Sequence, residues 1–191
     1  MLLLLLVGCK SKPVTLTSKD KKVQLTVYKG MVESSSLHKH AELQASNIFA
    51  ELYVVVFNEK KTSFPAHIDL KRYDALVRNN MKKKLGKTGK KEKTSDVSVN
   101  GHKAVRGALY GRIGKVKVGY LLTSIETHDS YHQVLAWTLR SHFKKQLPTF
   151  IKMTNTFKRI DGPKPTPGKS PQTRRKAPQK RPNKTPAARS K

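Results

Sequence analysis

Two closely spaced pairs of histidines are the first residues in this sequence that point to chemistry. His38 and His40 form one pair, and His128 and His132 form the other. Imidazole is a common metal ligand, but neither pair has the further His, Cys or carboxylate ligands of a zinc signature. We therefore predict no metal site and expect ordinary surface positions for His128 and His132.

A glycine- and lysine-rich segment at residues 86–90 superficially matches a phosphate-binding loop. It has too few residues between its two glycines, and Lys91 stands where the motif needs Ser or Thr. The chain also has no G-x-S-x-G or H-E-x-x-H motif. Its single cysteine lies near the N-terminus, outside the expected domain. These patterns predict that the protein is not an enzyme and needs no cofactor.

That cysteine ends an apolar run, MLLLLLVGC, at residues 1–9. The last four residues, LVGC, resemble the lipobox of bacterial lipoproteins, in which the cysteine thiol receives a diacylglyceryl group and the preceding segment is removed. The resemblance implies a truncated signal segment at 1–8 and a lipidated Cys9 with a short tether at 9–13. The apolar run is far shorter than the roughly 20 residues of a transmembrane helix, so it can direct export but cannot span a bilayer.

One feature of this segment departs from a secretory signal. Such signals open with basic residues, and here no Lys or Arg precedes Lys10. We therefore expect the true start codon to lie upstream of Met1. The alternative interpretation is an apolar N-terminus on a cytoplasmic protein.

Basic residues dominate the composition. The chain has 40 Lys and Arg against 12 Asp and Glu, which gives a formal net charge of +28 at pH 7. This balance implies an anionic partner, such as phospholipid head groups, a cell-wall polymer, lipopolysaccharide or nucleic acid. The residues that we expect to contact an anionic surface are Lys82, Lys83, Lys84, Lys87, Lys90, Lys91, Arg174, Arg175, Lys176, Lys180 and Arg181.

Residues 161–191 have a different character from the rest of the chain. They contain no Val, Leu, Ile, Met or aromatic residue, but they hold seven of the ten prolines and ten Lys or Arg. Because they have nothing apolar to bury, they cannot offset the entropy of ordering. We predict a disordered, Pro-rich basic tail at 161–191 after one globular domain at 14–160.

Alternation of apolar and polar residues predicts strands within that domain. Residues 14–17 and 23–27 are expected to pair across a turn, and 41–46 fit either a strand or a helix. Residues 52–57, LYVVVF, are apolar on both faces and form the predicted central strand. Four further strands are expected to form an antiparallel meander with turns at Asn100-Gly101 and 111–114, and they cover residues 97–100, 104–110, 116–125 and 131–139, with Trp137 in the core.

Two helices are predicted from apolar residues at helical spacing. Asp69 is the expected N-cap of the first helix, whose apolar face consists of Tyr73, Leu76, Val77, Met81 and Leu85. After Leu85 the periodicity ends in a lysine-rich loop. The second helix is expected to carry Phe143, Leu147, Phe150, Ile151, Thr154 and Phe157, with Pro148 at a kink or at its start.

In this order, the elements resemble the PsbP-like group, which includes the Ran-binding Mog proteins and DcrB-type bacterial lipoproteins. The residues that carry the resemblance lie between 14 and 160 and are Tyr53-Val54-Val55-Val56, Glu59-Lys60, Phe64, Leu70, Tyr73, residues 100–104 (NGHKA), the strand from Tyr131 to Trp137, Phe150 and Phe157. The resemblance implies an α+β fold, an α/β/α sandwich on a predominantly antiparallel sheet. It implies no shared catalytic residues, because members of this group act mainly by binding or by supporting larger assemblies.

These observations favour a lipoprotein of the cell envelope, anchored to the inner or outer membrane through lipidated Cys9. We expect a non-catalytic binding or assembly role, with the basic tail contacting anionic lipid or cell-wall polymer. The alternative is a cytoplasmic protein that binds nucleic acid non-specifically through its lysine-rich loop and tail. The tail has no aromatic residue for base stacking, so it is not expected to read a base sequence.

Overall fold

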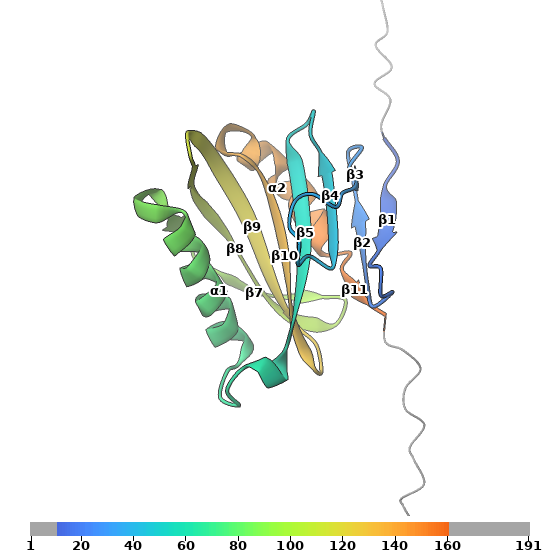
Figure 1. Ribbon diagram of the computed structural model, residues 1–191, viewed down its shortest axis with the longest axis vertical. Coiled ribbons are helices and arrows are strands. Elements are labelled where there is room, and N and C mark those ends of the chain that lie inside the picture. The colour runs from blue at the N-terminus through green and yellow to red at the C-terminus, as the bar shows by residue number, and fades with distance from the viewer. Residues whose placement is uncertain (1–10, 161–191) are drawn as a thin grey trace, which may run out of the picture. The chain divides into compact units, whose positions relative to one another are not determined.

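The computed structural model describes residues 11–160, which form two antiparallel sheets and two α-helices (Figure 1). The expectations for Cys9, the signal segment and the tail lie outside the described residues. In chain order the elements are β1 (Val14–Thr17), β2 (Val23–Val27), β3 (Val32–Glu33), β4 (Leu43–Asn47), β5 (Leu52–Lys60), the 3-10 turn η1 (Lys61–Ser63), α1 (Leu70–Lys84), the 3-10 turn η2 (Gly86–Thr88), β6 (Lys90–Lys91), β7 (Ser95–Val99), β8 (His102–Ile113), β9 (Val116–Glu126), β10 (Ser130–Leu139), α2 (Arg140–Thr154) and β11 (Lys158–Arg159).

The large sheet has the strand order β3-β4-β5-β10-β9-β8-β6, and β7 also pairs with β8. From β7 to β10 each strand pairs with the next, so the predicted antiparallel meander is confirmed. The turn between β7 and β8 consists of Asn100 and Gly101, both with positive φ (48° and 81°). Such a two-residue turn matches the twist of the flanking strands, which explains why Asn-Gly stands there.

The large sheet is covered differently on its two faces (Figure 1). α1 packs against β8 and β9 on one face, and α2 lies on the other face together with the small sheet β1-β2-β11. The main core lies on the α2 side and contains Phe143, Phe150 and Phe157. A second core lies under α1 around Tyr73 and Leu122. This arrangement is the predicted α+β fold with helical layers on an antiparallel sheet.

Several local expectations require correction. β5 is an inner strand, but β10 occupies the middle of the large sheet. Leu76 is 44% exposed on the outer side of α1, because the helix buries only one narrow stripe. α2 begins at Arg140 and contains Pro148, whereas Phe157 lies beyond the helix, on the segment that leads into β11.

Asp69 caps α1 as predicted. Its Oδ1 atom accepts a hydrogen bond from the backbone N–H of Arg72 at 2.8 Å. We expect Asp69→Ala to lower the free energy of unfolding by about 1 kcal/mol, because a backbone donor in the first turn loses its partner. Urea unfolding measures the change. Asp69→Ser keeps an acceptor and serves as the control, and equal losses in both variants would contradict the capping role.

The turns of the large sheet gather at its two ends. One end carries the β4–β5 turn (residues 48–51), the β8–β9 turn (residues 114–115) and the start of α2 at Arg140, because Tyr53 pairs with Trp137 and Leu139 with Val118. We call this the hairpin end. Ile160, the last described residue, lies at the opposite end, where its N–H donates to the carbonyl of Lys22, just before β2 begins.

Within residues 11–160, no helix has both the length and the apolar character that crossing a membrane requires.

Candidate functional site

Three of the predicted basic residues form the last turn of α1. Lys82, Lys83 and Lys84 are all exposed there. Cations are favourable at this position because the C-terminal end of a helix carries partial negative charge. The lysines therefore stabilise the end of α1 and at the same time point their ammonium groups into solvent.

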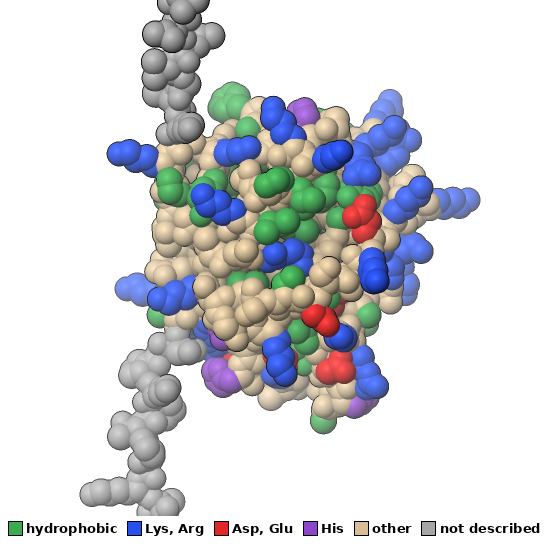
Figure 2. All heavy atoms as spheres, turned by 180° about the vertical axis from the view of Figure 1, so that it is seen from behind, with side chains coloured by type: hydrophobic (Ala, Val, Ile, Leu, Met, Phe, Trp, Pro, Cys, Tyr) green, Lys and Arg blue, Asp and Glu red, His purple; other side chains and the backbone are tan. Residues whose placement is uncertain are grey.

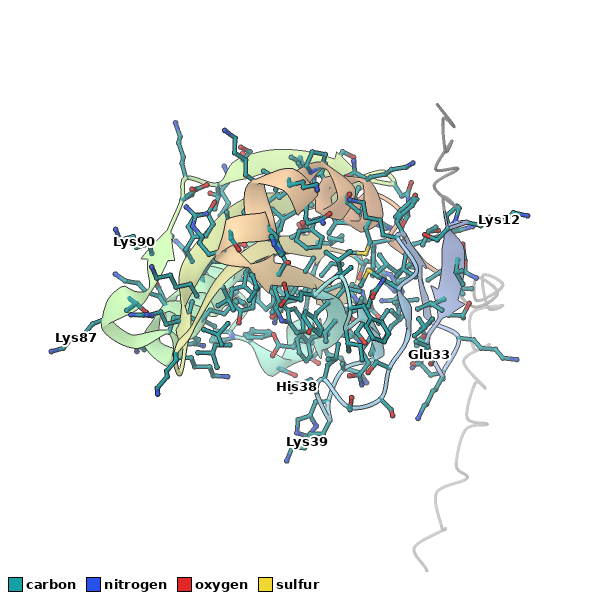
Figure 3. All side chains as sticks on the ribbon, turned by 90° about the horizontal axis from the view of Figure 1, so that it is seen from above. Lys12, Glu33, His38, Lys39, Lys87 and Lys90 are labelled. Atoms are coloured by element: carbon teal, nitrogen blue, oxygen red, sulfur yellow. The ribbon has the colours of Figure 1, made fainter. Side chains whose placement is uncertain are left out.

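The next three predicted residues lie in the segment that follows α1. Lys87 lies in η2, and Lys90 and Lys91 form β6, which pairs with β8. Lys91 Nζ donates to Asn79 Oδ1 on α1 at 2.6 Å, whereas Figure 3 shows Lys87 and Lys90 pointing outward into solvent. The segment predicted as an irregular loop is thus an ordered turn and a short edge strand.

The hydroxyl of Thr88 holds this turn in place. It donates to the carbonyl of Leu85 at 2.9 Å and accepts from the N–H of Arg112 at 3.1 Å. The second bond joins η2 to the β8–β9 hairpin. The lysines after α1 therefore have a fixed position beside the hairpin end.

This position adds basic residues that the sequence analysis did not single out. Arg112 and Lys117 face each other across the β8–β9 hairpin, and Lys115 lies in its turn. The guanidinium carbon of Arg140 lies 3.4 Å from the centre of the Tyr110 ring, a cation–π contact. In the sequence, the signal for these three residues was that basic side chains stand on both sides of Gly114.

Together these residues form what we call the basic surface, which consists of Lys82, Lys83, Lys84, Lys87, Lys90, Lys91, Arg112, Lys115, Lys117 and Arg140. Figure 2 shows Lys and Arg side chains gathered along this edge of the molecule. Among residues 11–160, none of these ten forms an ion pair with a carboxylate. Their charge is available to an external anion. The other predicted contacts, Arg174, Arg175, Lys176, Lys180 and Arg181, lie outside the described residues.

An apolar groove opens next to the basic surface. It has a volume of about 370 Å³ and is lined by side chains that include Tyr53, Val116 and Trp137. The rings of Tyr53 and Trp137 stack with their centres 5.3 Å apart. Trp137 is half-buried and packs against the second core, so its predicted place in the core is only partly correct. Its alternating position puts it on the α1 side of the sheet, where one side of its ring faces the open groove.

The two pairs of histidines have different surroundings. His38 and His40 lie on a surface loop with their ring centres 5.8 Å apart. His128 is exposed, whereas His132 is 1% exposed, so its expected surface position is wrong. Burial lowers the pKa of His132 to about 4, with a further contribution from the positive charge of Arg159. In the described part of the chain, no group of three or more His, Cys, Asp or Glu could hold a metal ion.

The two helices on an antiparallel meander define an α+β fold. No protein-family model matches the chain, and no curated protein matches it. Among solved structures, the cyanobacterial PsbP protein CyanoP of Synechocystis is similar, with a TM-score of 0.59 and 9% identity, and the match covers 81% of this chain and 95% of that chain.

Two further solved structures share this fold. The Ran-binding protein Mog1p of Saccharomyces cerevisiae has a TM-score of 0.57 and 11% identity, with 78% of this chain and 96% of that chain covered. LpqN of Mycobacterium tuberculosis, which is involved in cell envelope biogenesis, has a TM-score of 0.54 and 10% identity, with 78% and 91% covered. The resemblance to the PsbP-like group is confirmed at the level of the fold.

Proposed function

We propose that this protein is a lipid-anchored protein of the cell envelope with a non-catalytic binding or assembly role. In this proposal Cys9 carries the acyl chains, as its similarity to a lipobox implies. Two or more acyl chains make membrane attachment stable, whereas one chain alone is marginal. The fold agrees with a binding role, because one structural neighbour is described as Ran-binding and another as involved in envelope biogenesis.

The observation that carries the proposal is the position of Ser11, two residues after Cys9. A methyl group placed on Gly30 would lie 4.0 Å from Ser11 Oγ and 3.4 Å from Asn47 Nδ2. Ser11 and Asn47, the last residue of β4, therefore both lie next to Gly30, at the hairpin end. An anchor at Cys9 would hold this end, with the basic surface at its edge, against the bilayer. Each Lys or Arg near an anionic leaflet contributes up to about 1 kcal/mol.

The proposal also gives a role to the basic tail, residues 161–191. We propose that this tail engages an anionic polymer of the envelope. Ten Lys or Arg without a Val, Leu, Ile, Met or aromatic residue suit such a contact, which needs charge and reach but no folded surface.

Metabolic palmitate labelling with detergent phase partitioning tests the anchor. We expect the full chain to take up label and to enter the detergent phase, and Cys9→Ala to lose both, because no other thiol exists in the chain. Ser11→Ala, two positions away, is the control and should keep both. A wild-type protein that is unlabelled and soluble would contradict the proposal. Salt-dependent nucleic-acid binding would then be the next measurement.

A further inference from the structure

The β4–β5 turn exposes two large apolar side chains. Phe49 is 95% exposed and Ile48 is 65% exposed. Asn47 fixes the turn, because its Oδ1 accepts from the N–H of Ala50 at 3.1 Å and its Nδ2 donates to the carbonyl of Lys29 at 2.8 Å. An ordered turn thus presents a phenyl ring and a branched aliphatic side chain to water, which is unfavourable unless something covers them.

A second apolar turn lies at the same end of the sheet. At the tip of the β8–β9 hairpin, Ile113 is 57% exposed and Val116 is 48% exposed. Both residues line the groove of Tyr53 and Trp137 between the two turns. The exposed apolar atoms of the hairpin end therefore come from two separate turns with an aromatic groove between them. Such a concentration marks an interaction site more often than scattered apolar residues do.

Basic side chains flank these turns on both sides. Figure 3 shows Lys12 on one side of the molecule and Lys87 and Lys90 on the opposite side. Nearer the turns, Lys115 and Arg140 line a second open groove of about 490 Å³ beside Val116. Glu51, in the β4–β5 turn, lies 3.2 Å from His142 Nδ1. Exposed apolar side chains with basic side chains nearby fit a partner that is apolar in its interior and negatively charged at its surface.

We infer that the hairpin end docks directly on an anionic lipid bilayer, with Phe49 and Ile48 entering the boundary between head groups and acyl chains. Amphipathic surfaces bind bilayers in this way, by apolar burial together with attraction to anionic lipids. Tyr53 and Trp137 would lie at head-group depth, where such rings are enriched. This inference rests on the proposed membrane location, but it does not require acylation of Cys9.

A lipid surface fits these features better than a protein partner does. Protein interfaces bury a continuous, closely packed core, whereas here the apolar groups project from two turns. Apart from Glu51, which lies beside His142, the charged side chains named around these turns are basic. Ser11, the first described residue after Cys9, lies next to Gly30, as does Asn47 before the β4–β5 turn. The same end of the sheet would then carry the anchor, the apolar tips and the basic surface.

Vesicle binding by the unacylated full chain tests the inference. The full chain with Cys9→Ala is mixed with vesicles of equal parts phosphatidylglycerol and phosphatidylcholine, and binding is measured by sedimentation. We expect binding to these vesicles and little binding to phosphatidylcholine alone. Adding Phe49→Ser should lower the partition coefficient at least about tenfold, because the variant has no phenyl ring to transfer from water into the bilayer. Salt above about 0.15 M weakens the electrostatic contacts of the basic tail. The difference in partition coefficient between the parent and Phe49→Ser should remain at that salt.

Leu76→Gln provides the matched control. Leu76 is also an exposed apolar residue, but it lies on the outer side of α1, so its replacement should leave vesicle binding unchanged. Trp137 is the only tryptophan in the chain, and its emission should shift to shorter wavelength when vesicles cover the groove. Because Phe49 is almost fully exposed, its variant should unfold at the same urea concentration as the parent.

The outcomes separate this inference from the proposed anchor. Equal binding by the parent and Phe49→Ser, or an unshifted Trp137 emission, would show that charge alone holds the chain and would overturn the inference. Binding to nucleic acid but not to vesicles at the same salt would also overturn it. If Cys9 is labelled but the unacylated chain does not bind vesicles, only docking fails. If Cys9 is unlabelled while Phe49-dependent binding is found, only the anchor fails.

Discussion

Replacing Arg78 with methionine is expected to lower the free energy of unfolding by about 3 to 5 kcal/mol. Arg78 and Asp74 form an ion pair at 2.6 Å on α1, and their side chains are only 3% and 4% exposed. The two Nη atoms of Arg78 donate to the carbonyls of Gly107 and Leu122, each at 3.0 Å. One side chain thus joins α1 to β8 and β9.

The large effect follows from what the substitution leaves behind. Asp74 keeps a hydrogen bond from Ser124 Oγ at 2.8 Å, but its buried charge loses the opposing guanidinium. A buried charge without its partner is costly, whereas removing both partners of such a pair is often close to neutral. We therefore expect the double variant Asp74→Asn with Arg78→Met to recover part of the loss.

Urea unfolding measures these changes, with Arg72→Met as the control on the same helix. Arg72 is exposed, and its side chain donates to the carbonyl of His67, so the control should differ from wild type by less than about 0.5 kcal/mol. Hydrogen exchange should rise at Lys82–Lys84 in Arg78→Met, because that turn depends on α1 remaining packed. Wild-type stability in Arg78→Met would contradict the role assigned to the pair.

The second large effect is a loss of stability at acidic pH. We expect the protein to lose about 3 kcal/mol of stability through His132 as the pH falls from about 6.5 to about 4. The unfolded chain binds a proton at His132 near pH 6.5, but burial lowers the pKa in the folded protein to about 4. Between these values the unfolded state binds more protons, so stability decreases as the pH decreases. Below about pH 4 both states are protonated and this loss is complete.

Neighbouring groups modify the profile in a predictable way. Arg159 lowers the pKa of His132 further, and Asp129 opposes it. Burial raises the pKa of Glu42, so protonation of Glu42 favours the folded state at low pH and offsets part of the loss. Hydrogen bonds from Arg159 and Ser130 outweigh desolvation and lower the pKa of Asp129 to about 2. Its contribution is therefore lost only below the His132 range.

The comparison of two histidine variants isolates His132. His132→Gln removes the titrating group and should flatten the difference in stability between pH 6.5 and pH 4. His128→Gln, at an exposed position four residues earlier, should keep the wild-type slope. The free energy of unfolding in urea at several pH values gives both profiles. An equal slope in His132→Gln and wild type would assign the acid sensitivity to other groups.

The sequence by itself determined most secondary structure of residues 11–160, because local signals agree with the fold. The Asp69 cap, the spacing of Tyr73 and Val77 and the Asn100-Gly101 turn each act within a few residues. Alternation predicted the strands of the meander for the same reason. The resemblance to the PsbP-like group then indicated how helices and sheet combine, which periodicity cannot show.

Only the tertiary structure decided which side chains reach solvent. Leu76 and Trp137 carry core-like patterns but are partly exposed. Leu76 lies on the outer side of α1, and Trp137 lines the open groove beside the second core. His132 looks like a surface residue but is buried, because the ring of Phe157, on the segment that leads into β11, lies 5.0 Å from its ring. Periodicity indicates the face on which a residue lies, but it does not show what covers that face.

The hairpin end depends on pairing between distant segments. Phe49, Val116 and Arg140 are far apart in the chain, and the strand register brings their turns to one end of the sheet. The lysines after α1 could be predicted as a charged run, but their link to the hairpin through Thr88 and Arg112 joins segments 24 positions apart. Composition predicted an anionic partner, and the register of the strands determined where apolar and basic side chains meet.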